Sequence, residues 1–416
     1  MSKRINVSLV ILLVLTFLPA APVQAQSNAD CDYFGTHSDG ALYCITMPAN
    51  WNGDLVIFAH GYVAVDEPVD IPWSQMRFVN ENGYPLYMPD VINGLGFAFA
   101  TTSYSENGLA VKQGIDDIVD LIGVFKQKVR VPVHVYVVGA SEGGLVTTLV
   151  IERYSNLFSG GLAACGPIGS FTSQVNYWGD FRVIFDYFMD TPNLDVLPGN
   201  AVNIPSSLMS KWETVYTPRI SEVLVVNPLN TQRLFSVTKA PFDLSDLSSI
   251  GQTTLGILWY NVFATNDAVD KLGGHPYDNF DRVYTGLIND PLLNEEVKRF
   301  KAQPAALEEI ANYYETTGNL LRPMVTMHTT GDPIVPVWHQ ELYTEKVSGV
   351  FPAQPYVPIT IDRYGHCSFT LAEIQAGFSQ LVGMVMYDGM TIVTPMRILE
   401  AGESSQLEGT YSYDYR

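Results

Sequence analysis

The sequence has little charge, and basic residues are the scarcer kind. Of its 416 residues only 16% are charged, and 23 Lys and Arg stand against 43 Asp and Glu, which leaves a formal net charge of −20. A chain of this charge would repel a phosphate backbone, so we expect no nucleic acid among its partners. Hydrophobic residues make up 47% of the sequence, which excludes a disordered, collagen-like or coiled-coil chain and supplies a sizeable core.

Motifs for metals, cofactors and nucleotides are also missing. The chain contains no H-E-x-x-H, no paired C-x-x-C, no Walker loop and no EF-hand pattern. We therefore expect no metal and no cofactor, so any chemistry has to come from the side chains themselves.

The N-terminal segment has the composition of a secretory signal peptide. Lys3 and Arg4 precede an apolar run at 7–18, and small residues follow at 23–25. The run is shorter than the roughly 20 apolar residues that cross a bilayer. We expect cleavage after Ala25, a secreted or periplasmic location, and no membrane span in the mature protein.

Only four cysteines are present, an even number that suits an oxidising compartment. Three pairings are possible. Cys31 and Cys44 flank the turn signal Ser38-Asp39-Gly40, so a disulfide could link the strands of a hairpin. That pairing leaves Cys165 with Cys367, and two buried free thiols are the alternative.

Short apolar runs alternate with helix-like segments from residue 54 onward, which is typical of an α/β protein with a mostly parallel sheet. The segment at 170–321 interrupts this pattern, is rich in aromatic residues, and is too long for a loop. We expect it to be an inserted, mostly helical cap domain. The expected strands are 55–59, 97–102, 133–138, 161–165, 324–328 and 357–361, with helices through 115–125 and 371–386. The expected domains are a signal peptide (1–25), a core in two parts (26–169 and 322–398), the cap (170–321) and a tail (399–416).

A G-x-S-x-G motif occurs once, at residues 139–143, and centres on Ser141. A β-branched strand runs into it and a helix-forming segment runs out of it, which is the context of a nucleophile elbow. The turn exposes the serine hydroxyl, and small flanking residues let strand and helix approach closely. We predict Ser141 as a nucleophile; the alternative is that Gly139 and Gly143 only shape a turn.

A serine hydroxyl is a poor nucleophile until a histidine, itself held by a carboxylate, takes its proton. His366 follows the last expected strand on a loop and is the predicted base. Asp332 follows the preceding strand, in a turn stiffened by Pro333 and Pro336, and is the predicted acid.

The sequence contains other candidate acids and bases. Asp362 is nearer to His366 in sequence, but it fits better as a residue of one sheet face or as a partner of the neighbouring arginine. We expect His60 to be structural or to orient residues of the site without touching the substrate itself. We expect His328 to be a core residue in mid-strand, and His339 to lie at the surface or against the cap.

The oxyanion of a tetrahedral intermediate needs two convergent donors. The backbone N–H of Glu142, directly after the nucleophile, is one candidate, and that of Tyr62, after His60-Gly61, is the other. We expect the Glu142 carboxylate to cap the dipole of its own helix, with selection of a cationic substrate group as the alternative.

These motifs, in the order Ser141, Asp332, His366, resemble the α/β-hydrolase superfamily over about residues 54–169 and 322–390. The resemblance implies a mostly parallel, eight-stranded sheet with helices on both faces. The pair His366-Cys367 is also similar to secreted tannases and feruloyl esterases, where a cysteine beside the histidine is disulfide-linked near the nucleophile. Those enzymes place the partner directly before the serine, where this chain has Ala140, so Cys165 becomes the implied partner.

The predicted function is that of an exported serine hydrolase that cleaves small-molecule or polymeric carboxylic esters through an acyl-enzyme. A secreted peptidase or amidase with the same triad is the alternative, because acyl transfer to water is alike for both. A binding protein on the same scaffold is a third possibility. Aromatic residues of the cap either line an apolar pocket or pack the cap against the core: Tyr177, Trp178, Phe181, Phe185, Tyr187, Phe188, Trp259 and Tyr260.

Overall fold

The structure is a computed structural model that describes residues 27–79, 84–191, 195–350, 355–386 and 396–398. The expected signal peptide and the C-terminal tail lie outside the described residues. No helix in the described part of the chain is long and apolar enough to cross a membrane.

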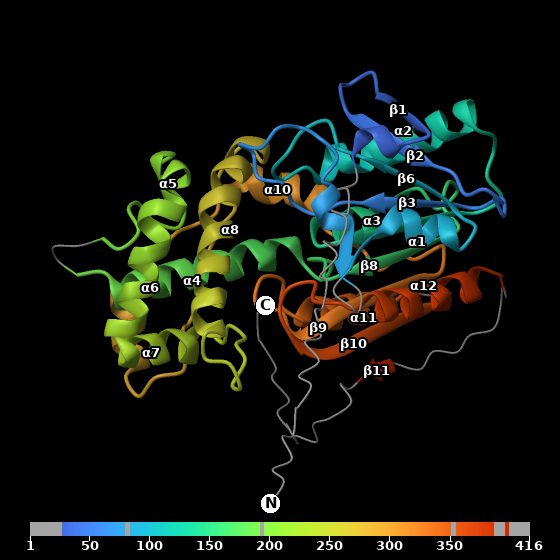
Figure 1. The fold of residues 1–416 in the computed structure, drawn as a ribbon. Coiled ribbons are helices and arrows are strands. Elements are labelled where there is room, and N and C mark those ends of the chain that lie inside the picture. Colours follow the sequence, from blue (N-terminus) through green and yellow to red (C-terminus); the bar gives the residue numbers. More distant parts are fainter. Residues whose placement is uncertain (1–26, 80–83, 192–194, 351–354, 387–395, 399–416) are drawn as a thin grey trace, which may run out of the picture.

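The centre of the molecule is a nine-stranded sheet, in which β2 runs in the direction opposite to the other eight strands (Figure 1). The strand order is β1-β2-β6-β3-β7-β8-β9-β10-β11. The first eight strands form the α/β-hydrolase fold, as expected, and β11 adds a ninth strand at the edge. The strands are β1 (Tyr33–Thr36), β2 (Leu42–Thr46), β3 (Leu55–Ala59), β6 (Ala98–Thr102), β7 (Val135–Ala140), β8 (Gly160–Ala164), β9 (Met324–Gly331), β10 (Tyr356–Tyr364) and β11 (Met396–Ile398).

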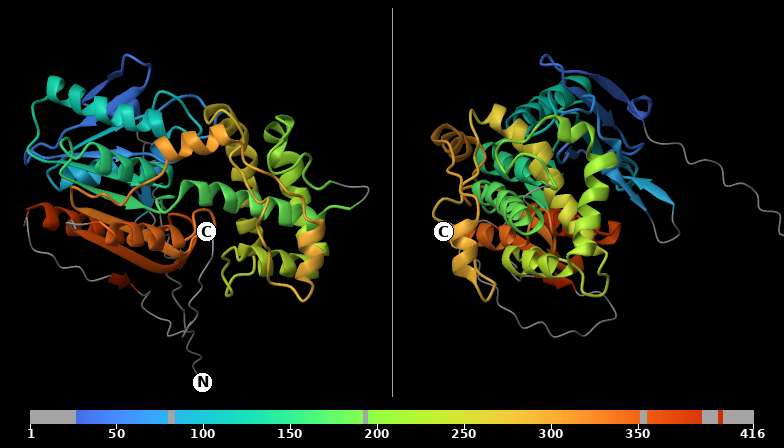
Figure 2. Two further views of the ribbon diagram at one scale, coloured as in Figure 1. Left: turned by 180° about the vertical axis from the view of Figure 1, so that it is seen from behind. Right: turned by 90° about the vertical axis from the view of Figure 1, so that its left-hand side faces the viewer.

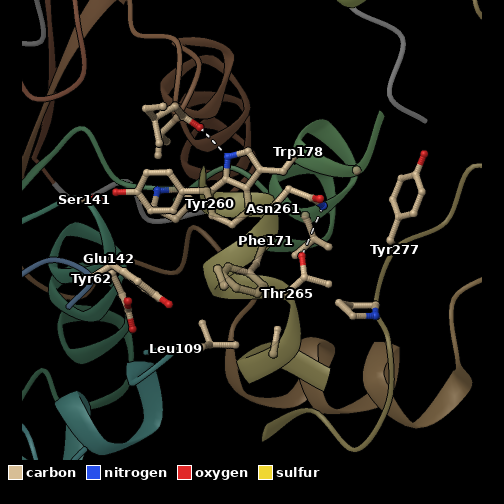
Figure 3. Close-up of a pocket in the computed structure, with 18 of the residues that line it drawn as sticks. Tyr62, Leu109, Ser141, Glu142, Phe171, Trp178, Tyr260, Asn261, Thr265 and Tyr277 are labelled. Atoms are coloured by element: carbon tan, nitrogen blue, oxygen red, sulfur yellow. Dashed lines mark hydrogen bonds between the residues drawn. The ribbon is translucent and has the colours of Figure 1, made fainter. Parts of the chain in front are cut away.

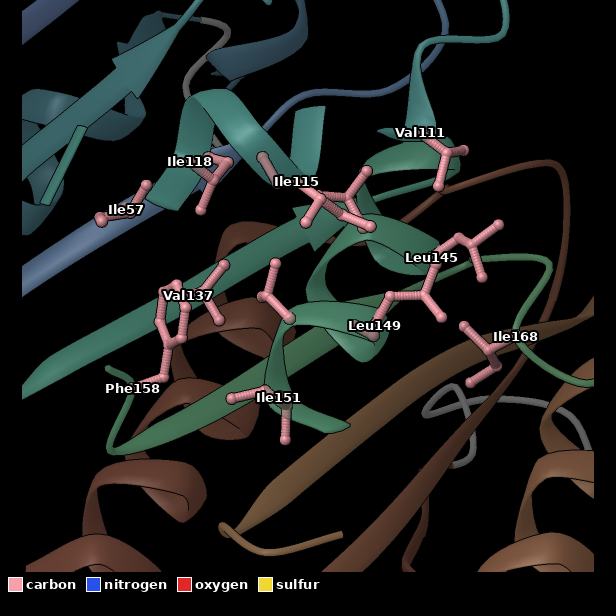
Figure 4. Packing of buried hydrophobic residues seen from close by; sticks show 14 of the residues in the cluster. Ile57, Val111, Ile115, Ile118, Val137, Leu145, Leu149, Ile151, Phe158 and Ile168 are labelled. Atoms are coloured by element: carbon pink, nitrogen blue, oxygen red, sulfur yellow. The ribbon is translucent and has the colours of Figure 1, made fainter. Parts of the chain in front are cut away.

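Helices cover both faces of the sheet because successive strand residues point to opposite sides. Ile57 and Val137 pack on one face, with side chains of α2, α3 and α11 (Figure 4). Val56 and Val138 pack on the other face, with side chains of α1 and α12. These helices are α1 (Met88–Gly94), α2 (Val111–Lys128), α3 (Glu142–Arg153), α11 (Trp338–Ser348) and α12 (Leu371–Met386).

One expected strand is displaced. The segment predicted at 133–138 forms β7 at Val135–Ala140 instead. Val131 and Val133 are both 70% exposed, so these two apolar residues belong to the surface loop before the strand. The strand gains its last two residues because it runs directly into the turn at Ser141.

The cap is inserted between β8 and β9, and its helices stand beyond one end of the sheet (Figures 1 and 2). It has its own apolar core, in which Phe181 and Phe185 of α4 meet Ile257 and Val262 of α8. The last helix, α10, differs, because Ala306 and Ile310 pack into the core beside the sheet. The inserted helices are α4 (Phe171–Met189), α5 (Ser207–Ser210), the π-helical turn η3 (Trp212–Tyr216), α6 (Thr217–Val226), α7 (Pro228–Thr238), α8 (Ser249–Lys271), α9 (Asp290–Glu296) and α10 (Pro304–Tyr313).

Smaller elements complete the fold. Two disulfides are present, Cys31–Cys44 in the hairpin of β1 and β2, and Cys165–Cys367 between strand ends that are 202 residues apart in sequence. The remaining elements are η1 (Asn28–Asp30), η2 (Trp73–Met76), and a two-stranded ribbon of β4 (Arg77–Val79) and β5 (Pro85–Tyr87).

Candidate active site

Ser141 sits on a tight turn between β7 and α3. Its backbone has φ 57° and ψ −123°, a conformation that is strained for a residue with a side chain. The flanking glycines are required by close packing. A Cβ on Gly139 would lie 2.0 Å from the carbonyl oxygen of Gly143, and a Cβ on Gly143 would lie 2.0 Å from that of Ala59. The sequence motif is therefore a strand–turn–helix elbow.

Three distant side chains meet at this turn. The Nε2 atom of His366 lies 2.9 Å from Ser141 Oγ, and its Nδ1 atom lies 2.7 Å from Asp332 Oδ2. With the proton on Nδ1, the ring donates to Asp332 and accepts from the serine hydroxyl. The chain of hydrogen bonds is the one expected of a nucleophile, a base and an orienting acid.

Two backbone hydrogen bonds and a neighbouring histidine fix the position of the Asp332 carboxylate. Its Oδ1 accepts hydrogen bonds from the backbone N–H groups of Ile334 and Val335, at 2.9 and 3.0 Å. His328 donates to the carbonyl oxygen of Val335 at 2.7 Å and lies 3.7 Å from Asp332 Oδ2. Burial lowers the pKa of His328, which is a core residue as expected and also braces the turn of the acid.

The histidine loop is tied to the sheet at several points. Cys367, next to the base, forms its disulfide with Cys165 at the end of β8. Thr329 donates to the carbonyl oxygen of Gly365 at 2.6 Å. Asp362, the rival acid, accepts from Thr330 at 2.8 Å, so it is Asp332 that contacts the imidazole.

The site also contains residue types that can bind a metal ion. In the described part of the chain one cluster brings three possible ligand atoms together, those of Cys165, His366 and Cys367. Both sulfur atoms are in the disulfide, so neither is available as the thiolate that binds a metal. His366 uses its two ring nitrogens in hydrogen bonds with Ser141 and Asp332 instead.

Two backbone segments face the nucleophile. Glu142 is the first residue of α3, where a helix leaves its N–H groups without intrahelical partners. The loop Gly61-Tyr62 lies against the elbow, since a Cβ on Gly61 would be 3.2 Å from Ser141 Cβ. Gln75 pins this loop: it accepts from Gly61 N at 2.7 Å and donates to the Tyr62 carbonyl at 3.2 Å.

The role of Gln75 was not predicted from the sequence. It lies in the short helix η2, 14 residues after Gly61, and no motif links the two positions. Only the folded loop brings its amide to the backbone of Gly61 and Tyr62.

The Glu142 carboxyl lies in the first turn of α3, but its hydrogen-bond partner belongs to another helix. Its Oε1 accepts a hydrogen bond from the backbone N–H of Ala110, at the start of α2, at 2.6 Å. The residue is only 7% exposed. This burial raises the pKa of the Glu142 carboxyl to about 8, so the group is largely protonated at neutral pH.

Two further histidines take structural positions. His60 stacks on Tyr104 with ring centroids 3.8 Å apart, and burial lowers its pKa to about 4. His339 is buried, so the surface alternative is wrong. It contacts the cap, because its Nε2 donates to Gln174 Oε1 of α4 at 2.7 Å and its Nδ1 accepts from Gly169 N at 3.1 Å.

An apolar pocket of about 730 Å³, including its opening to solvent, lies between the elbow and the cap (Figure 3). Ser141 and Glu142 form part of its wall, and α4 and α8 form the opposite side. Trp178 stacks on Tyr260 at 5.0 Å between centroids, and its indole N–H donates to the Ile334 carbonyl at 3.0 Å. Both expectations for the aromatic residues therefore hold, since these two rings line the pocket while Phe181 and Phe185 pack the interior of the cap.

No family model matches the chain, and no curated protein matches it. Among solved structures, an esterase of Pyrococcus furiosus is 13% identical over 85% of this chain and 88% of that chain, with a TM-score of 0.41. Mouse alpha/beta hydrolase domain-containing protein 10 is 11% identical over 85% and 98%, with a TM-score of 0.40. Acylaminoacyl peptidase of Pyrococcus horikoshii is 10% identical over 80% of this chain but only 36% of that chain, with a TM-score of 0.39. Similarity at this level says nothing about substrate, so the functional argument rests on the side chains.

Proposed function

We propose that this chain is an exported serine hydrolase that cleaves carboxylic esters through a covalent acyl-enzyme. The observation that carries the proposal is the hydrogen-bond chain from Ser141 through His366 to the buried Asp332. Such a chain activates a serine hydroxyl without a metal or a coenzyme.

The geometry supports a two-step reaction. Ser141 Oγ attacks the ester carbonyl carbon while His366 Nε2 takes the hydroxyl proton, and Asp332 stabilises the imidazolium that forms. The N–H groups of Glu142 and Tyr62 bind the oxyanion. His366 then gives the proton to the departing alcohol, and the same base activates the water that releases the acid and restores the serine.

The pocket favours an ester over a peptide substrate. None of the described residues that line it is a lysine or arginine, and Glu142 is the one acidic residue among them. Because burial keeps this carboxyl largely protonated, the wall offers no fixed charge to hold a peptide terminus. An apolar wall of this kind suits an uncharged acyl or alcohol group.

Export is supported by two observations of different kinds. The N-terminal composition is that of a signal peptide, and all four cysteines are paired in disulfides. Disulfides persist in oxidising compartments and are rare in the cytosol.

A labelling experiment tests the nucleophile. A fluorophosphonate probe should label the wild-type protein and Ser207→Ala, which changes an exposed serine of the cap, but not Ser141→Ala. Persistent labelling of Ser141→Ala would mean that another residue is the nucleophile, and an unlabelled wild type would favour a binding protein.

A panel of substrates tests the substrate class, by comparing short-chain aryl esters with aminoacyl and prolyl amides. Faster cleavage of an amide would favour the peptidase alternative.

A further inference from the structure

The pocket beside Ser141 contains a polar atom that the protein leaves without a partner. Asn261 of α8 lines the pocket and is 1% exposed, and its Oδ1 is buried with no hydrogen bond to any described residue (Figure 3). Folded proteins satisfy nearly all buried polar groups, because an unmade hydrogen bond is costly. A buried acceptor without a partner beside a pocket is therefore suited to a donor on a ligand.

The rest of the Asn261 amide is already engaged. Its Nδ2 lies 3.4 Å from Thr265 Oγ1 and 3.5 Å from the carbonyl oxygen of Ala201. These contacts direct the amide nitrogen to the protein and leave Oδ1 as the free acceptor.

Asn261 lies beside an apolar stripe of α8. Tyr260, Ala264 and Ala268 of α8 also line the pocket, at spacings of four residues that place them on one face of the helix. This face follows the pocket for about 12 Å, given a rise of 1.5 Å per residue. A ligand that fills the pocket is therefore mainly apolar and meets a hydrogen-bond acceptor at Asn261.

The charge of the pocket favours a neutral group as the ligand's hydrogen-bond donor to Asn261. Glu142 is the one ionisable carboxyl in the wall, its Oε1 is used by the N–H of Ala110, and its burial raises its pKa to about 8. An ammonium group entering this pocket would lose its hydration and find as its counter-charge only the buried carboxyl of Glu142, which is already hydrogen-bonded to Ala110 N. A hydroxyl or an amide N–H would lose less and would satisfy Asn261.

We propose that the natural substrate is an ester whose apolar chain carries a neutral hydrogen-bond donor, a hydroxyl or an amide N–H, which donates to Asn261 Oδ1. Asn261 is then a specificity-determining residue of the pocket. The inference rests on the proposed ester hydrolysis and adds to it the class of chain that the pocket selects.

The test compares kcat/KM for aryl esters of straight-chain acids with those of the matching ω-hydroxy acids, over a series of chain lengths. A second series places the hydroxyl on the alcohol side of the ester. We expect wild type to prefer a hydroxylated ester by about tenfold at the length that reaches Asn261, the ratio given by one hydrogen bond to a buried group. Asn261→Leu should abolish this preference.

Asn266→Leu is the matched control. It makes the same change on α8, but Asn266 does not line the pocket and donates to the Ile204 carbonyl at 2.9 Å. It should keep the preference. Inhibition of wild type by the hydroxy acid and by the plain acid gives the same comparison without any variant.

Three results would overturn the inference: no preference at any chain length, a preference that survives in Asn261→Leu, or better cleavage of a chain ending in an ammonium group. Cleavage of the plain esters separates this failure from that of the proposed function. If wild type cleaves neither plain nor hydroxylated esters, the ester-hydrolase proposal itself is wrong.

Discussion

Replacing Glu142 by glutamine should stabilise the protein increasingly as the pH rises from about 5 to 8. The carboxyl lies in the pocket wall, and burial raises its pKa from 4.5 to about 8. Between these two values the native state keeps a proton that the unfolded chain has lost. Stability rises with pH only where the unfolded state binds more protons, so here the wild type loses stability as the pH rises.

The size of the effect follows from the shift. Each pKa unit corresponds to about 1.4 kcal/mol, so a rise from 4.5 to about 8 sets an upper limit of about 5 kcal/mol. The loss begins near pH 4.5, grows with a slope of up to about 1.4 kcal/mol per pH unit, and levels off above pH 8. Glutamine has no proton to lose, and its amide oxygen can still accept from Ala110 N.

Urea unfolding followed by tryptophan fluorescence, at several pH values from 5 to 9, measures the difference in unfolding free energy between Glu142→Gln and wild type. The control is Glu308→Gln, which removes a carboxylate from an exposed position of α10 and should show no trend of this size. A difference that stays flat across this range, or that favours wild type more strongly at higher pH, would mean that Glu142 is ionised and compensated in the native state. The pocket wall would then carry a negative charge.

Two further predictions concern the backbone around the nucleophile. Gln75→Leu removes the side-chain hydrogen bonds that Gln75 makes to Gly61 and Tyr62, so kcat/KM for an aryl ester should fall about 100-fold, as when one oxyanion donor is lost. Gln113→Leu on α2 is the control. An unchanged rate for Gln75→Leu would mean that Gln75 does not position the oxyanion loop. Gly143→Ala should lower the melting temperature by several degrees, because its Cβ would lie 2.0 Å from a carbonyl oxygen. Differential scanning fluorimetry checks this, and an unchanged melting temperature would contradict the close packing.

Much of the fold could be predicted because local patterns carry it. The helix expected at 371–386 has those bounds, and β3 has the expected bounds of 55–59. Apolar periodicity and Gly or Pro boundaries are local properties that survive in the folded chain. The displaced strand β7 shows the limit of this reasoning, because periodicity alone does not distinguish an exposed valine from a buried one.

The candidate triad could also be predicted from the sequence, since each of its residues follows an expected strand. Parallel strands end at one edge of the sheet, so residues at these ends converge there. Local sequence does not decide whether Asp332 or Asp362 contacts the histidine, because both lie near the end of an expected strand. The contact is made by Asp332, whose carboxylate is oriented by the turn at Ile334 and Val335.

The sequence by itself determined the order of strands and helices and the glycine-flanked turn at Ser141. It also placed a candidate base and a candidate acid after later strands, because each of these features depends on residue type and local spacing. Only the tertiary structure decided that Glu142 contacts α2, that Gln75 holds the oxyanion loop, and that Asn261 Oδ1 has no partner beside the pocket. Burial and hydrogen bonding between distant segments set these features. Neither quantity exists until the cap and the sheet pack together.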